Sequence, residues 1–246
     1  MLLRKTRKRL IYRVKLAIFE SGNFQEMLDL RDKYRLEDSM GFRGQFDEHR
    51  RFQFDLLKRR GLLPHHRLLE IGCGPLTGGL PLIGYLNPGN YTGVDVRDSV
   101  LNLAWKEVGK AGLSARNPRL IQSSSFGSNE LRGQQFDFVL SFSVLYHLSD
   151  EILASYLAAV RERLNATGQC LANVNTQDAS STWLEFPFLR RTIEDYENLA
   201  RSKGLETSRL GELAELGFLL PGIERRNQML AFRPTSVPAN GDARLG

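Results

Sequence analysis

A carboxylate followed by closely spaced glycines is the strongest chemical signal in this sequence. Glu70 lies in a short apolar run, Leu68–Ile71, and Gly72 and Gly74 come directly after it. Such a run predicts a buried strand, and glycines beyond it let the backbone lie against a ligand at the carboxyl edge of an open α/β sheet. An unpaired buried charge is costly, so a carboxylate at Glu70 indicates that a ligand or a neighbouring polar group binds it. We interpret residues 67–79 as a ligand-binding turn.

A second acid narrows the choice of ligand. Asp95 ends the next predicted strand about twenty residues after the turn, where open α/β units bind the ribose of an adenosine-containing cofactor. The glycines do not complete the dinucleotide pattern G-x-G-x-x-G, because Thr77 stands where its third glycine belongs. A carboxylate at Glu70 also suits a cation, such as the sulfonium and ammonium of S-adenosylmethionine (SAM). The alternative for both acids is that they cap the amides of the turn.

Three motifs occur in an order typical of one enzyme superfamily. They are Leu68–Gly74 (LLEIGCG), Val94–Asp95 and Phe136–Phe142 (FDFVLSF). Over residues 61–233 the chain resembles class I SAM-dependent methyltransferases, and among them the bacterial small-molecule-type domains. The resemblance implies SAM as cofactor and an α/β fold. Its Rossmann-like, doubly wound sheet would have seven mostly parallel strands with an antiparallel last strand.

The resemblance assigns the cofactor contacts to the carboxyl ends of successive strands. Asp95 would bind the ribose hydroxyls, and Glu70 the methionine end or its waters. Where the family contacts the adenine, often through an acid, this chain has the hydroxyls and aromatic ring of Ser123–Phe126. The predicted SAM-binding residues are Glu70, Gly72, Cys73, Gly74, Asp95, Val96, Ser125, Phe126 and Ser141.

The segment after the fourth predicted strand, Ser141–Leu148, holds the candidates for catalysis. Of the four histidines, His147 alone is expected at the catalytic face, and a neutral imidazole is a suitable general base near pH 7. Its alternative role is to brace the loop against the next helix. Tyr146 is expected to orient the acceptor or to line the cofactor pocket. Residues 176–191, rich in aromatics, predict a lid or acceptor-binding insert, although aromatic packing would look the same.

Missing motifs narrow the acceptor. No Asn/Asp-Pro-Pro-aromatic sequence or Pro-Cys pair occupies Ser141–Val144, which disfavours two routes of nucleic-acid base methylation. Ser141 stands where metal-dependent O-methyltransferases have an acid, so no metal is expected. We expect a small or amphiphilic acceptor, with lipid-like molecules and glycosides among the candidates. RNA methylation is one alternative, and a non-catalytic SAM-binding subunit or membrane-associated scaffold is another.

Basic residues are concentrated in the first 60 residues of the chain. Residues 1–60 hold 16 of the 34 Lys and Arg residues but only 9 of the 28 Asp and Glu residues, so the net charge of +6 belongs to this segment. We predict a basic helical segment at 1–60 that covers the cofactor or forms a surface arm, a SAM-binding domain at 61–233 and a disordered tail at 234–246. The candidates for the cofactor's carboxylate are Arg43, His49 and Gln53, in and just before the expected helix over 45–60; the alternative is that they are surface residues of a packing helix.

The first residues form a basic arm with a helical apolar stripe. Residues 2–18 have seven basic side chains and no acid. This pattern predicts an interfacial helix on an anionic membrane surface. Nucleic acid is less favoured, because the rest of the chain is near neutral. The alternative is a helix that packs on the domain or on another subunit, and the oligomeric state is left open.

Cysteine usage indicates a reducing compartment. Cys73 lies in the turn and Cys170 in a later predicted strand. In the strand order that the resemblance implies, one other strand separates theirs, so the two are about 10 Å apart and too far for a disulfide. No apolar run reaches the roughly 20 residues that a membrane span needs. Arg13 and Lys15 interrupt the only candidate core of a signal peptide. We expect a cytoplasmic protein, peripheral at a membrane if the arm binds lipid.

Overall fold

The computed structural model describes residues 44–176, 182–183, 186–220 and 223–235. The chain divides into two compact units, Met1–Asp47 and Glu48–Gly246. The predicted basic arm at 2–18 and the candidate Arg43 lie outside the described residues. So do residues 177–181 and 184–185 of the predicted aromatic insert and 236–246 of the predicted tail. Pro234, also assigned to that tail, instead ends the last strand of the sheet.

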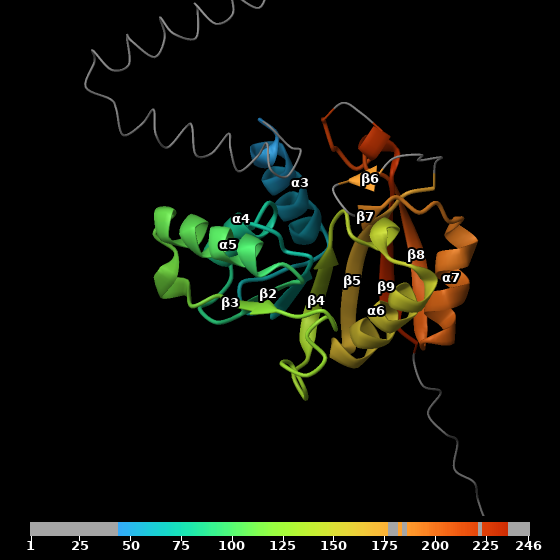
Figure 1. Cartoon of the computed structure of the whole chain (residues 1–246), viewed down its shortest axis with the longest axis horizontal. Helices are drawn as coiled ribbons and strands as arrows, with labels where there is room; N and C mark the ends of the chain where they lie inside the picture. The colour runs from blue at the N-terminus through green and yellow to red at the C-terminus, as the bar shows by residue number, and fades with distance from the viewer. Residues whose placement is uncertain (1–43, 177–181, 184–185, 221–222, 236–246) are drawn as a thin grey trace, which may run out of the picture. The chain divides into compact units, whose positions relative to one another are not determined.

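Seven strands form one sheet in the order β3-β2-β1-β4-β5-β9-β8 (Figure 1). The first five in that order are parallel, and β9 runs antiparallel to both β5 and β8. This confirms the predicted doubly wound sheet with an antiparallel last strand. The bounds are β1 Leu68–Ile71, β2 Tyr91–Asp95, β3 Arg119–Gln122, β4 Phe136–Ser141, β5 Leu164–Val174, β8 Leu205–Glu212 and β9 Gln228–Pro234. A two-stranded hairpin, β6 Thr182–Trp183 with β7 Phe186–Pro187, stands apart from it.

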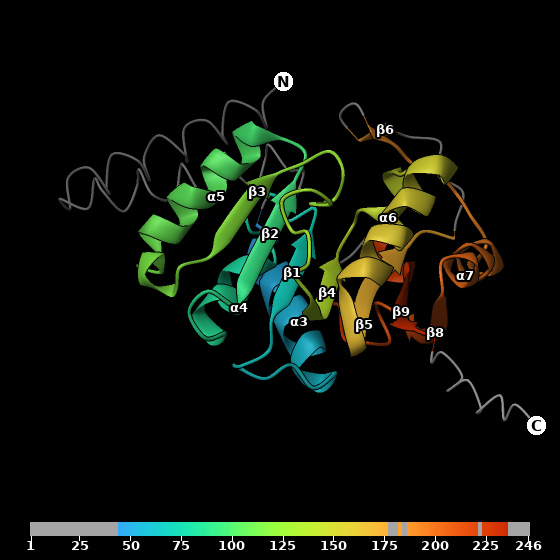
Figure 2. The same cartoon turned by 90° about the horizontal axis from the view of Figure 1, so that it is seen from below.

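Helices cover both faces of the sheet. One core cluster joins it to α3, α4 and α5, and the other joins it to α6 and α7. Figure 2 shows α4 and α5 beside β1–β3, and α6 and α7 on the other half of the molecule. The helices are α3 Phe46–Arg59, α4 Gly79–Tyr85, α5 Asp98–Lys110, α6 Asp150–Arg163 and α7 Ile193–Ser202, with 3-10 turns η1 Ser114–Arg116, η2 Leu145–His147 and η3 Ile223–Arg226.

The alternation of side chains along each strand decides which layer a residue enters. On β1, Leu68 belongs to the α3–α5 core and Leu69 to the α6–α7 core. Glu70 comes next, on the same face as Leu68. Because the strand order reverses between β1 and β4, the carboxyl ends of these two strands border the crevice where such sheets bind ligands.

Both cysteines are free and buried. Cys73 comes after β1 and Cys170 lies in β5, with β4 between them, as predicted. Among the described residues, no helix is long and apolar enough to cross a membrane.

Candidate active site

The glycine turn after β1 is held against the end of β2. The backbone N–H groups of Gly72 and Cys73 both donate to the carbonyl oxygen of Val94, at 2.7 and 3.1 Å. Gly72 and Gly74 have φ values of +77° and +54°, which glycine adopts without strain. The turn therefore presents its backbone at the carboxyl edge of the sheet, as the motif predicts.

Asp95 fastens this turn to the next loop. Its Oδ2 accepts the N–H of Gly74 and its Oδ1 accepts the N–H of Arg97, both at 3.0 Å, and its exposed fraction is 6%. Asp95 therefore caps turn amides. Each carboxylate oxygen has two acceptor sites, so this role leaves capacity for the two hydroxyls of a ribose. Ribose binding stays a prediction, and the observed geometry accommodates it.

Glu70 has a partner inside the fold. Its Oε2 accepts a hydrogen bond from the hydroxyl of Tyr91, and its exposed fraction is 3%. Burial raises the pKa of Glu70 to about 8, the Tyr91 hydrogen bond opposes this, and the charge of Asp95 adds to it. A Cβ at Gly79 would collide with the Tyr91 hydroxyl and would lie 2.6 Å from Glu70 Oε2. Glu70 thus packs against the first turn of α4, and its contact with the methionine end stays a prediction.

We expect the stability of the ligand-free protein to fall as pH rises, because of Glu70. The pKa of Glu70 is raised from an ordinary value of 4.5 to about 8, so between these pH values the folded protein keeps Glu70 protonated while the unfolded chain ionises it. The contribution of Glu70 to stability is therefore complete below pH 4.5 and is lost by pH 8. The free energy of unfolding should decrease by on the order of 4–5 kcal/mol across this range. Urea unfolding at pH 5 and pH 8.5 measures it. Glu70→Gln should flatten the pH dependence, and an equally steep dependence in that variant would assign it to other groups.

Gln53 of α3 lies directly on the cofactor turn. A Cβ at Gly78 would collide with its carboxamide, and the exposed fraction of Gln53 is 2%. Among the described residues, Gln53 Oε1 has no hydrogen-bond partner. The carboxamide oxygen can accept from an ammonium and Nε2 can donate to a carboxylate, so the predicted contact of Gln53 with the cofactor's carboxylate stays a prediction. Together with Glu70 and Asp95 it gives the turn the acceptor groups that a cationic nucleoside requires, so SAM fits this site.

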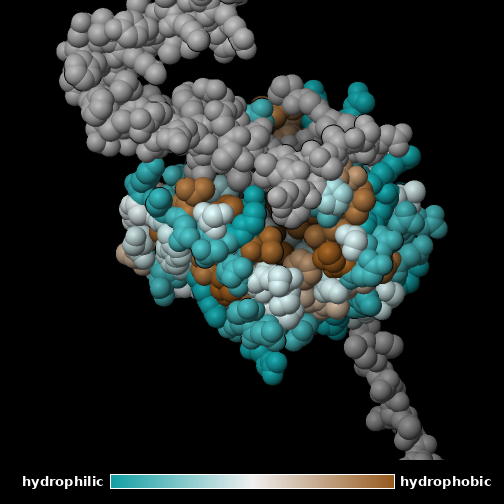
Figure 3. All heavy atoms as spheres, in the orientation of Figure 1, coloured by the Kyte–Doolittle hydropathy of each residue, from teal (hydrophilic) through white to brown (hydrophobic). Residues whose placement is uncertain are grey.

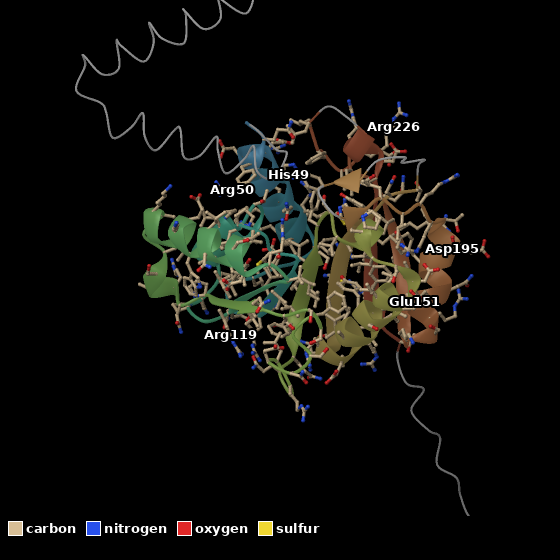
Figure 4. All side chains as sticks on the ribbon, viewed as in Figure 1. His49, Arg50, Arg119, Glu151, Asp195 and Arg226 are labelled. Carbon is tan, nitrogen blue, oxygen red and sulfur yellow. The ribbon has the colours of Figure 1, made fainter. Side chains whose placement is uncertain are left out.

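His49, one turn before Gln53, belongs to an aromatic cluster instead. Its ring meets those of Phe142 and Phe218 edge-on, with centroids 5.7 and 5.2 Å away. Burial lowers the pKa of His49 to about 4, so the ring is neutral at physiological pH. Figure 4 labels His49 on α3. His49 therefore cannot bind the cofactor's carboxylate as a cation.

Val96 follows β2, and the segment predicted to meet the adenine, residues 123–126, follows β3. The exposed fraction of Val96 is 46%, which leaves an apolar surface directly after Asp95. Phe126 has a left-handed backbone (φ +56°), and its ring meets that of Tyr156 edge-on at 5.5 Å. The hydroxyl of Ser125 lies 3.3 Å from that of Ser123. Contacts of Val96, Ser125 and Phe126 with the cofactor stay predictions.

Two other predicted binding residues have buried side chains. The Ser141 hydroxyl is 0% exposed and accepts a hydrogen bond from Tyr156 at 2.8 Å, on the α6 side of the sheet. Cys73 packs against β2, where a Cβ at Gly93 would lie 2.9 Å from its sulfur. Burial raises the pKa of the Cys73 thiol well above its ordinary value. Contacts of Ser141 and Cys73 with the cofactor stay predictions.

The segment after β4 contacts the glycine turn. A Cβ at Gly72 would collide with Cγ2 of Val144, so this valine lies against the bare Cα of the glycine. Ser143, one residue earlier, has φ +59°, and its N–H donates to Oδ1 of Asn173 at 2.6 Å. The turn η2 comes next and carries Tyr146 and His147. The two predicted catalytic residues thus follow, two and three positions later, the valine that contacts the predicted cofactor turn.

The ring of His147 is fixed by a backbone carbonyl. Nδ1 of His147 lies 2.7 Å from the carbonyl oxygen of Pro187. A carbonyl can only accept, so the proton is on Nδ1 and the neutral ring has its basic lone pair on Nε2. Burial lowers the pKa of His147, and the hydrogen bond to Pro187 opposes this. The imidazole is therefore in the protonation state that a general base requires near pH 7.

Tyr146 is covered by the segment directly after β7. Its ring stacks on that of Phe188, with centroids 5.4 Å apart and planes 10° apart, and its exposed fraction is 4%. The N–H of Leu189 donates to the Tyr146 carbonyl at 2.7 Å. His147 also contacts the Phe188 ring, at 4.8 Å. Residues 187–189 of the predicted aromatic insert thus pack on the predicted catalytic turn.

Several groups that help to build the site could not be identified from the sequence by their residue type. Tyr91 could be placed on the same face as Glu70, diagonally across the strand pair, only once β1 and β2 were paired in register, with Leu68 beside Tyr91. Asn173 and Val144 are ordinary residues of a strand and a loop. The carbonyl of Pro187 is a backbone group, which no residue type reveals.

Comparisons with known proteins agree with this geometry. Residues 69–170 match a family model described as a methyltransferase domain. A TehB-like SAM-dependent methyltransferase from Corynebacterium glutamicum is 18% identical over 75% of this chain and 88% of its own, with a TM-score of 0.55. Magnesium protoporphyrin IX methyltransferase from Synechocystis, crystallised with SAM, is 14% identical over 76% of this chain and 80% of its own, with a TM-score of 0.56. The CcbJ methyltransferase from Streptomyces caelestis is 13% identical over 76% of this chain and 90% of its own, with a TM-score of 0.58.

The doubly wound sheet, with its glycine turn and the acid at the end of β2, defines a Rossmann-like nucleoside-binding domain. The family match identifies residues 69–170 as a methyltransferase domain, and the sheet shares its fold with the SAM-dependent methyltransferases named above; its cofactor is SAM.

Proposed function

We propose that this methyltransferase acts on a small or amphiphilic acceptor, with His147 as general base and without a metal. The observation that carries the proposal is the hydrogen bond between His147 Nδ1 and the Pro187 carbonyl, which leaves the basic lone pair on Nε2. SAM supplies a methyl group on a sulfonium, ready for in-line transfer. His147 then has to remove one proton from an acceptor hydroxyl or ammonium, and Tyr146, stacked on Phe188, is a rigid neighbour that can orient the acceptor.

The surroundings of Ser141 support the absence of a metal from the reaction. Metal-dependent relatives have an acid at this position. Here the hydroxyl is fully buried and engaged by Tyr156, so the side chain offers no ligand at the carboxyl edge of β4. A metal-free reaction needs a protein base for any acceptor proton of high pKa, which is the role given to His147.

The aromatic and apolar character of the segment after β4 supports an acceptor with an apolar part. Phe142 packs with Phe52 and Phe218 at the end of β4, and Tyr146 stacks on Phe188 after it. On the face seen in Figure 3, hydrophobic residues gather in the middle, between the α4–α5 half and the α6–α7 half. One structural neighbour is a porphyrin methyltransferase, so the fold admits a large ring compound as acceptor.

Formation of S-adenosylhomocysteine (SAH) over an acceptor panel tests the proposal. The panel contains phenols, amines, glycosides, lipid-like amphiphiles and RNA, each assayed with and without EDTA. We expect turnover with a small or amphiphilic acceptor and no loss in EDTA. Turnover with RNA alone, lost when residues 1–20 are deleted, would support the RNA alternative. SAM binding without turnover on any acceptor would support a non-catalytic subunit.

We also propose a cytoplasmic location, peripheral at a membrane if residues 2–18 bind anionic lipid. The two free, buried cysteines support a reducing compartment. Sedimentation with vesicles of phosphatidylserine and phosphatidylcholine tests the arm: binding should require the anionic lipid and should disappear when residues 1–20 are deleted.

A further inference from the structure

A buried amide on β5 contacts the segment after β4. Asn173 is 0% exposed and pairs with Met229 of β9 in the sheet. Its Oδ1 accepts the N–H of Ser143 at 2.6 Å. Among the described residues, its Nδ2 has no hydrogen-bond partner. Burial of an amide is costly unless its hydrogen bonds are made, so Asn173 is a poor choice for packing alone.

The residue that Asn173 holds has an unfavourable backbone conformation. Ser143 has φ +59°, and a side chain other than glycine makes the left-handed region costly by about 1–2 kcal/mol. The hydrogen bond that the Ser143 N–H donates to Asn173 Oδ1 offsets part of that cost, because it is made only when the chain turns at Ser143. Ser143 is where the chain leaves β4, which ends at Ser141, and turns toward η2.

The residues just after this turn connect the two halves of the site. Val144 lies against Gly72 of the cofactor turn. Immediately beyond it, Tyr146 and His147 are in contact with residues 187–189. A change in the direction of the chain at Ser143 would therefore move both Val144 and His147.

We propose that Asn173 is a positioning residue, which fixes Ser143 in the left-handed conformation so that Val144 meets Gly72 and His147 meets the Pro187 carbonyl. This inference rests on the proposed function, in which η2 carries the base. Asn173 acts through Ser143 and needs no contact with the cofactor or the acceptor. The Asn173 side chain thereby couples the affinity of the cofactor turn to the geometry of the base.

Three variants test this: Asn173→Leu, Ser143→Gly and the double variant. Leucine has about the volume of asparagine but lacks the oxygen that accepts the Ser143 N–H. We expect the SAH dissociation constant of Asn173→Leu to rise about tenfold, which is the upper range for the loss of one hydrogen bond. NMR should show the His147 titration moving up toward pH 6.5 as the ring leaves its buried position. Because glycine adopts positive φ freely, adding Ser143→Gly should restore both readings to within about threefold of wild type. Ser143→Gly alone should change neither.

Equal losses in Asn173→Leu and in the double variant would overturn the proposal, since packing alone would not respond to glycine at Ser143. Should neither variant fold, hydrogen exchange in the wild-type protein decides. The Ser143 amide should then be protected nearly as well as core amides of β4, and exchange at the rate of exposed loop amides would contradict the proposal. Failure of the wild-type protein to bind SAH would count against the assigned cofactor, not against Asn173.

Discussion

Alanine at Gly72 should weaken the binding of SAH by at least about 100-fold. Two effects combine: the residue has φ +77°, which costs a side chain about 1–2 kcal/mol, and the new Cβ would collide with Cγ2 of Val144. Either the turn or the segment after β4 must move, and both belong to the site. Isothermal titration calorimetry with SAH measures the loss, and circular dichroism reports whether the fold survives.

Gly89→Ala is the matched control for this variant. Gly89 also has a positive φ, +83°, but no atom lies within 4 Å of the place its Cβ would take. It therefore carries the backbone cost without the collision. We expect Gly89→Ala to lower the melting temperature slightly and to leave SAH affinity unchanged. If it weakened SAH binding as much as Gly72→Ala, the loss would reflect general strain, and the contact between Gly72 and Val144 would have no special importance.

Glutamine at His147 should lower kcat by about 100- to 10,000-fold, the usual contribution of a general base. SAH affinity should stay within about threefold of wild type, because the ring is assigned to the acceptor's proton. The rate of the wild-type enzyme should fall only below pH 6.5, since burial lowers the pKa of His147 from that value and the base is active when deprotonated. Pre-steady-state rates with the best acceptor of the panel, from pH 5 to 8, measure both effects.

His65→Gln is the control for the loss of an imidazole. His65 is exposed and precedes β1 at the amino edge of the sheet, away from the carboxyl edge that bears the site. Its rate and pH profile should match wild type. If His147→Gln kept full activity with an unchanged acid limb, His147 would be a brace for residues 187–189, which is its alternative role.

The sequence predicted the site residues best where a charged side chain lies at the carboxyl end of a predicted strand. Glu70 and Asp95 end short apolar runs, and because β1 and β2 are parallel neighbours the two acids meet at one edge. The same alternation, applied to β4, could also have placed Ser141. Val139 belongs to the α6–α7 core, so Ser141 two residues on faces Tyr156 rather than the α3–α5 layer.

Contacts between distant elements could not be predicted in this way. Periodicity assigns Gln53 to the buried face of a helix, but only the packing of α3 brings it against Gly78. The bonds of His147 to Pro187 and of Ser143 to Asn173 join segments 40 and 30 residues apart. Each involves a backbone group, and every residue except proline carries the same N–H, so residue types give no indication of the partner.

The central claim is that the turn at Gly72 and the carboxylate of Asp95 together bind SAM. Calorimetric titration of SAH into the wild-type chain and into Asp95→Ala tests it most directly. We predict one site per chain, with binding weakened at least tenfold in the variant because the ribose contact and the cap of the turn are lost together. Absence of binding to the wild-type chain, or equal affinity in the two proteins, would contradict the account.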